Sequence, residues 1–131
     1  MNSYTSYAEL IKPEWAPPAF LFGPVWAVLY LIIAISFSFV FYEVYKGKLS
    51  KSIALPFLLN IIFNIAFTPI QFELKNNLLA LIDIIAVLIT LIWAMYAIYP
   101  KFRFVALANI PYLLWVSFAT ILQATITFLN W

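Results

Sequence analysis

The chain has 131 residues, of which 66% are hydrophobic, 20% are aromatic and only 9% are charged, with a net charge of +2. About a quarter of the residues of a soluble domain carry charge, so this composition excludes a soluble fold and indicates a membrane protein. Cys and His are both absent, which removes disulfides, zinc sites and the usual axial haem ligands. We therefore expect no metal site. The small, dispersed positive charge also argues against nucleic acid as a partner.

Residues 1–17 form a polar segment ahead of the first apolar run. The segment is too short to span a bilayer, and no basic region followed by an apolar stretch marks a cleavable signal sequence. Trp15 suits the headgroup layer, because its ring is apolar and its N–H needs a polar partner. Pro17 and Pro18 fix two backbone angles where a helix begins. The simplest interpretation of these three residues is an anchor at the membrane surface.

Four stretches are long and apolar enough to cross a bilayer as helices. They cover about residues 19–45, 52–72, 77–99 and 102–131. Lys46, Gly47 and Lys48 suit the end of the first helix, Pro100 ends the third, and Pro111 predicts a kink inside the fourth. The connections are short, so consecutive helices are expected to be antiparallel neighbours. We predict an all-α integral membrane protein in which residues 1–131 form one domain, an antiparallel bundle of four transmembrane helices.

The cations near the helix ends predict the orientation of this bundle. One side carries five of them: Lys46, Lys48, Lys51, Lys101 and Arg103. The other side carries Lys12 and Lys75. Because cytoplasmic loops are enriched in Lys and Arg, both termini are expected on the non-cytoplasmic side.

Polar residues inside the predicted spans form a candidate layer about 10–13 Å below the outer surface, on a rise of about 1.5 Å per residue. The layer comprises Trp26, Asn64, Asp83 and Gln123. Asn60 lies one turn deeper than Asn64 on the same helix face. A carboxylate in lipid costs about 3 kcal/mol or more, so Asp83 is expected to face the bundle interior or a cavity. Two interpretations stay open: a structural hydrogen bond to Asn64 or to a Trp or Tyr donor, and the polar wall of an outward-opening pocket.

Aromatic residues give the second indication of a site. A cavity lined by rings and a few polar groups would suit a large, flat, apolar ligand. Trp115 lies near the predicted midplane, away from the interfacial belts in which Trp is common. A Trp inside a helix is nevertheless more often a packing residue than a ligand contact, and that interpretation also stays open.

Five sequence blocks follow one another between about residues 7 and 130. They are Lys12-Pro13-x-Trp15-x-Pro17-Pro18; Phe22-Gly23-Pro24-Val25-Trp26 with Leu29-Tyr30; Asn64 with Pro69 and Phe72; Ala80-Leu81-Ile82-Asp83; and Pro111-Tyr112-x-x-Trp115-x-x-Phe118-Ala119. In these blocks and their separations the chain resembles the tryptophan-rich sensory protein family, also called translocator protein or peripheral benzodiazepine receptor.

The resemblance implies a membrane receptor that binds porphyrins, sterols or synthetic aromatic ligands in a bundle pocket. The loop carrying Trp15, Pro17 and Pro18 would cap that pocket, and members often dimerise. No obligatory cofactor is expected, and a porphyrin or haem-like tetrapyrrole would be the ligand. Together with the polar layer, the resemblance gives these expected ligand-binding residues: Trp15, Pro17, Pro18, Trp26, Tyr30, Asn60, Asn64, Phe67, Asp83, Trp115, Phe118, Ala119 and Gln123.

The chain departs from the family pattern in several ways. Members usually have five spanning helices, whereas this chain starts in what looks like the loop after the first. Phe67 stands where a Trp is typical, and that Trp is linked to light-driven porphyrin breakdown in bacterial members. Because phenylalanine is harder to oxidise than indole, such chemistry is not favoured here. Ala124 and Phe128 replace the Tyr and Arg of the animal sterol motif, so cholesterol recognition is not supported.

Three functional hypotheses follow. The first is a receptor for a tetrapyrrole or a similar flat hydrophobic ligand, with the bilayer, that ligand and a second copy of the chain as partners. The second is a small dimeric exporter of aromatic cations in which Asp83 exchanges substrate for protons. Such exporters carry their key acid in the first span, but residues 19–42 contain none. The third is a light-dependent, porphyrin-degrading enzyme with Trp115 as radical site. No nucleophile and base pair is evident, so no catalytic residue is assigned.

Overall fold

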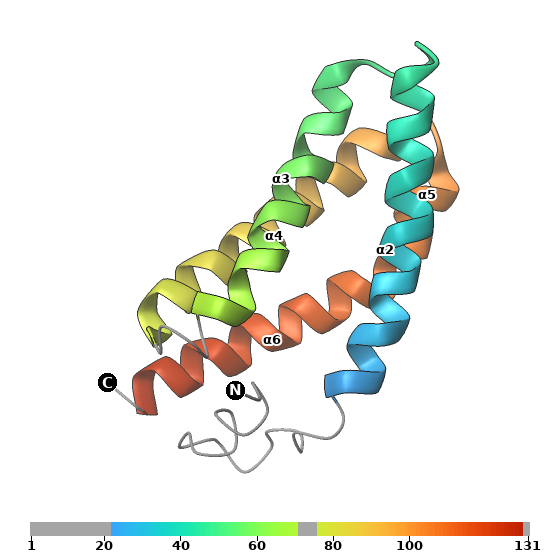
Figure 1. The fold of residues 1–131 in the computed structure, drawn as a ribbon. Coiled ribbons are helices and arrows are strands. Elements are labelled where there is room, and N and C mark those ends of the chain that lie inside the picture. Colours follow the sequence, from blue (N-terminus) through green and yellow to red (C-terminus); the bar gives the residue numbers. More distant parts are fainter. Residues whose placement is uncertain (1–21, 71–75, 130–131) are drawn as a thin grey trace.

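The computed structural model describes residues 22–70 and 76–129, which are helical apart from short connections (Figure 1). The helices are α2 (Phe22–Tyr45), α3 (Lys51–Thr68), α4 (Asn77–Ile98), α5 (Arg103–Ala108) and α6 (Ile110–Leu129). The described residues contain no strand. The fold class is therefore all-α, as the composition predicts.

The length and composition of these helices fit a bilayer. Within the described ranges, Gly23–Tyr45, Asn77–Ile98 and Ile110–Leu129 are long and apolar enough to cross a membrane, and Lys51–Phe67 is a shorter apolar helix. Large apolar side chains such as Ile35, with 66% of its surface exposed, cover the outside of the bundle. Exposure of this kind suits contact with lipid, which has no polar groups to offer the chain in the bilayer core.

The helices pack as a bundle in which α4 is central. α3 lies along α4, α4 lies along α6, and α2 contacts α3 and α5 (Figure 1). The inner stripe of α4 consists of Ile84, Val87, Leu91, Ala94 and Ile98, which are all buried. Their spacing of three or four residues keeps them on one face of the helix. This stripe is the side of α4 that the other helices cover.

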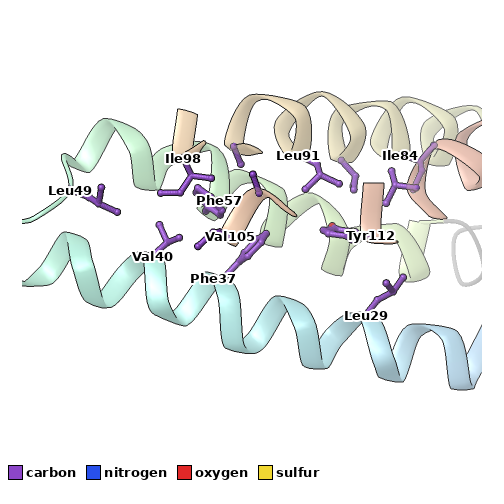
Figure 2. Packing of buried hydrophobic residues seen from close by; sticks show 14 residues of the cluster. Leu29, Phe37, Val40, Leu49, Phe57, Ile84, Leu91, Ile98, Val105 and Tyr112 are labelled. Atoms are coloured by element: carbon purple, nitrogen blue, oxygen red, sulfur yellow. The ribbon is translucent and has the colours of Figure 1, made fainter. Parts of the chain in front are cut away.

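The hydrophobic core joins α2 to the rest of the bundle. Phe37 and Val40 of α2 point toward Phe57 of α3 and Val105 of α5 (Figure 2). The rings of Phe37 and Phe57 meet edge to face, with centroids 4.8 Å apart. This contact orders the half of α2 that leads into the loop before α3.

The end of α2 is fixed by a glycine turn. Gly47 has a φ of 82°, a left-handed conformation that glycine adopts without steric cost. The Lys48 amide donates to the Glu43 carbonyl at 2.9 Å, and the Gly47 amide donates to the Val44 carbonyl at 3.0 Å. These two bonds form a Schellman motif. Lys46 Nζ lies 3.2 Å from the Glu43 carboxylate, and this hydrogen bond raises the pKa of Lys46.

The last predicted span, about residues 102–131, is not one continuous helix. The structure divides it into α5 and α6 at Asn109, two residues before Pro111. Pro111 has no amide hydrogen to donate, and its ring clashes with the preceding turn, so the helix breaks just upstream. Asn109 stabilises the break, because its Nδ2 donates to the Val105 carbonyl at 2.8 Å and to Ser36 Oγ of α2 at 3.0 Å.

Candidate ligand-binding site

A buried polar chain begins with three side chains from α3 and α6. The Tyr112 hydroxyl donates to Asn60 Oδ1 at 2.8 Å and accepts from Asn64 Nδ2 at 2.7 Å. Asn60 and Tyr112 are completely buried, and Asn64 is 9% exposed. Because Asn60 and Asn64 lie four residues apart, α3 presents both amides on one face, and a single hydroxyl can bridge them.

The same chain continues to the other two long helices. Asn60 Nδ2 donates to the Val87 carbonyl at 2.9 Å and to Thr90 Oγ1 at 3.2 Å, both in α4. From α2, the Tyr30 hydroxyl donates to Asn64 Oδ1 at 3.3 Å. We call Tyr30, Asn60, Asn64, Thr90 and Tyr112 the polar chain. It connects α2, α3, α4 and α6 in an apolar medium, where an unpaired polar group is costly.

An aromatic group adjoins the polar chain at Tyr30. We define it as Trp26, Tyr30, Trp115 and Phe118. The Trp26 and Tyr30 rings have centroids 5.3 Å apart, and Trp26 meets Trp115 of α6 edge to face at 6.5 Å. The ring centroids of Trp115 and Phe118 lie 5.7 Å apart. Trp26, Trp115 and Phe118 are only partly buried, so their rings keep accessible surface on the margin of the polar chain.

Asp83 is buried on α4, with 7% of its surface exposed. Its Oδ2 atom has no hydrogen-bond partner in the described part of the chain. The side chain of Asn64 bonds Tyr30 and Tyr112, and within the described residues it forms no hydrogen bond with Asp83. A buried carboxyl oxygen without a partner is costly, and such groups concentrate at functional sites.

The remaining expected residues fall into three sets. Phe67 and Ala119 are partly buried and pack against the hydrophobic core. Gln123 donates to the Asn77 carbonyl at 3.2 Å and to Thr127 Oγ1 at 3.1 Å. Asn77 begins α4 and lies thirteen residues before Thr90, about 20 Å along the helix, so Gln123 binds the start of α4 and not the polar chain. Trp15, Pro17 and Pro18 lie outside the described residues.

Two members of the polar chain, Thr90 and Tyr112, were not among the expected site residues. Both carry signals that could have indicated them. Tyr112 is a phenol deep in a span, where its O–H needs a partner. Thr90 lies seven residues after Asp83, two helical turns along the same face. No group of three or more His, Cys, Asp or Glu that could hold a metal ion occurs among the described residues.

The fold and this site define a class: a multi-helix integral membrane protein with polar and aromatic side chains gathered in its interior. The sequence matches the profile of the TspO/MBR family over residues 1–129. The chain therefore belongs to the TspO/MBR family.

Relatives span bacteria and animals. The chain is 41% identical to the tryptophan-rich protein TspO of Bacillus cereus over 126 residues, which cover 96% of this chain and 81% of that protein. It is 29% identical to the tryptophan-rich sensory protein of Cereibacter sphaeroides over 125 residues, which cover 95% of this chain and 77% of that protein. It is 32% identical to the human translocator protein over 120 residues, which cover 89% of this chain and 70% of that protein. The similarity therefore extends over most of each chain.

Proposed function

We propose that this protein is a membrane receptor for a porphyrin or a similar flat hydrophobic molecule, with a sensory, regulatory or transport role. One observation carries the proposal: the aromatic group of α2 and α6 is continuous with the polar chain through Tyr30, which is half-exposed. A flat ligand needs both kinds of surface. Its rings stack on aromatic side chains, and its polar edge needs a few fixed donors or acceptors.

The chemistry of the site fits a tetrapyrrole. Trp26 and Trp115 lie on different helices and touch edge to face, so a planar guest lying against their accessible surfaces would contact both indoles. Asp83 offers an acceptor oxygen without a partner among the described residues, which suits a ligand N–H or a cationic group. The family resemblance implies porphyrins as the ligand class and a homodimer as the assembly. We include both in the proposal.

Binding of protoporphyrin to the detergent-solubilised chain tests this function. Quenching of Trp fluorescence should saturate, and the absorbance of the bound porphyrin gives an affinity that does not depend on which Trp remains. Trp115→Ala should weaken binding about fivefold or more, since an aromatic contact contributes about 1 kcal/mol beyond its buried area. Trp115→Phe should retain most of the affinity.

The matched control is Trp93→Ala. Trp93 lies on α4, is 41% exposed and is not part of the aromatic group. Its removal should leave porphyrin affinity unchanged. Quenching by wild-type protein that never saturates, or equal losses in Trp115→Ala and Trp93→Ala, would contradict the proposal.

A second candidate function is proton-coupled export of aromatic cations, favoured by the buried Oδ2 of Asp83. A carboxylate that binds either a proton or a cation would couple the two. In proteoliposomes with an imposed pH gradient, the wild-type protein should then move a fluorescent aromatic cation, and Asp83→Asn should abolish the movement. Transport at equal rates by both proteins, or by neither, would eliminate this candidate.

A further inference from the structure

A groove on the outside of the bundle lies apart from the site described above. It has a volume of about 510 Å³ and runs where α4 passes α5 and α6. Its walls include Ile92, Tyr96, Tyr99, Leu107, Ile110 and Leu113. None of them belongs to the polar chain or the aromatic group. The walls are almost entirely apolar, and most of these side chains are exposed toward the lipid.

The groove covers most of the depth of one leaflet of a bilayer. Along the end of α4 it extends from Ile92 to the C-cap residue Tyr99, which is seven residues or about 10 Å of helix. One leaflet contributes about half of a 30 Å hydrocarbon core. Pro100 follows the end of α4, so the groove opens at the end of a span, where headgroups lie. Its length and position fit one acyl chain.

Two cations lie close in the sequence to Tyr99 and Pro100, the groove residues at the end of α4. The guanidinium carbon of Arg103 is 5.2 Å from the ring centroid of Tyr99, a groove residue. Lys101 is exposed and directly follows the groove residue Pro100 in the connection before α5. The ion pair found in the described part of the chain joins Lys46 to Glu43, so neither Lys101 nor Arg103 is neutralised by an acid there. An anion is therefore the complementary occupant.

We propose that this groove binds an anionic phospholipid, with one acyl chain against α4, α5 and α6 and the phosphate between Lys101 and Arg103. A zwitterionic lipid would bring its own cation next to these two. A second copy of the chain could also cover the groove, related to the first by a two-fold axis along the membrane normal. Its Lys101 and Arg103 would then lie at the same depth in the membrane as those of the first copy, and repulsion between these like charges disfavours such a dimer contact. The anionic lipid satisfies both the apolar walls and the charges.

Native mass spectrometry of the full chain in detergent tests this proposal. The probe is an equimolar mixture of dioleoyl phosphatidylglycerol and dioleoyl phosphatidylcholine. The wild-type protein should retain the anionic phosphatidylglycerol preferentially. Lys101→Gln with Arg103→Gln should lower that preference by about fivefold for each cation removed. Leu107→Trp should reduce retention of both lipids, because the larger ring fills the groove.

Two controls match these variants. Lys48→Gln with Lys51→Gln removes two exposed cations from the α2–α3 connection and the start of α3, on the same predicted side of the membrane, and should leave the preference unchanged. Leu114→Trp adds the same ring to an exposed position of α6 outside the groove and should retain both lipids. Equal retention of the two lipids by the wild-type protein would overturn the proposal. So would equal effects of the two double variants, or a Leu107→Trp protein that loses a dimer and no lipid.

Discussion

At the scale of single residues, Tyr112 holds the polar chain together. Its one hydroxyl donates to Asn60 and accepts from Asn64, so two amides of α3 depend on one atom of α6. Hydrogen bonds between membrane helices contribute modestly on average, but a buried group that loses its partner costs more. Tyr112 is also fully buried in the hydrophobic core (Figure 2).

Tyr112→Phe should therefore lower the free energy of unfolding by about 1–2 kcal/mol. The ring and its packing remain, while Asn60 Oδ1 and Asn64 Nδ2 each lose a partner. Unfolding by a denaturing detergent, followed by circular dichroism, gives the value. Tyr96→Phe is the control, since Tyr96 is 83% exposed. Equal stability of Tyr112→Phe and Tyr96→Phe would mean that the bridge contributes nothing.

The sequence indicated which residues are polar and interior, but not how they pair. The cost of a polar group in lipid placed Asn60, Asn64 and Asp83 in the bundle interior, where they are buried. Asn64 bonds Tyr30 and Tyr112, which lie 34 and 48 residues away from it in the sequence and on two other helices. Which hydroxyl reaches which amide depends on how each helix is rotated about its axis. Periodicity in one helix does not determine its rotation relative to another.

At the scale of helices, the break between α5 and α6 shows both what sequence can predict and where it fails. Pro111 predicts a disturbance in the last apolar stretch. It does not predict that Asn109 would stabilise the break with bonds to the Val105 carbonyl and to Ser36 of α2. That second bond depends on the packing of α2 against the break, which no local pattern shows.

Asn109→Ala should destabilise this junction. It removes the bonds to the Val105 carbonyl and Ser36 Oγ, and we expect a loss of about 1–2 kcal/mol in the free energy of unfolding. Ser36→Ala removes the bond from Asn109 to α2 and the bond from the Ser36 hydroxyl to the Ile32 carbonyl within α2. It keeps the Val105 bond and should cost less. Hydrogen exchange of the amides in residues 105–113 should rise more in Asn109→Ala than in Ser36→Ala. Unchanged exchange in Asn109→Ala would show that Pro111 alone maintains the break.

At the scale of the whole molecule, composition was enough to predict a helical membrane protein, because so few charged residues cannot cover a soluble surface. The spacing of apolar residues along each helix accounts for the apolar surface toward lipid and for the inner stripe of α4. The α-helix of α3 ends at Thr68 and α6 begins after Asn109, so both differ in extent from the apolar runs of the sequence. Neither the aromatic contact between α2 and α6 nor the groove beside α5 could be predicted from one helix at a time.

The orientation of the bundle is a further prediction at this scale. The chain has no Cys, so a single introduced Cys reports on one position. With both termini on the non-cytoplasmic side, a membrane-impermeant maleimide should label Ser3→Cys in intact cells and should label Lys48→Cys only after the membrane is opened. The reverse pattern would invert the topology and place Lys101 and Arg103 in the opposite leaflet.

The receptor account depends on a planar ligand lying against Trp26 and Trp115. The five Trp residues can be replaced with fluorotryptophan, and each fluorine signal can be assigned by a Trp→Phe variant. Binding of a paramagnetic iron porphyrin to the protein in lipid nanodiscs should then broaden the signals of Trp26 and Trp115 most strongly and leave that of Trp93 sharp. Uniform broadening of all five signals, or broadening led by the lipid-facing Trp93, would contradict the account.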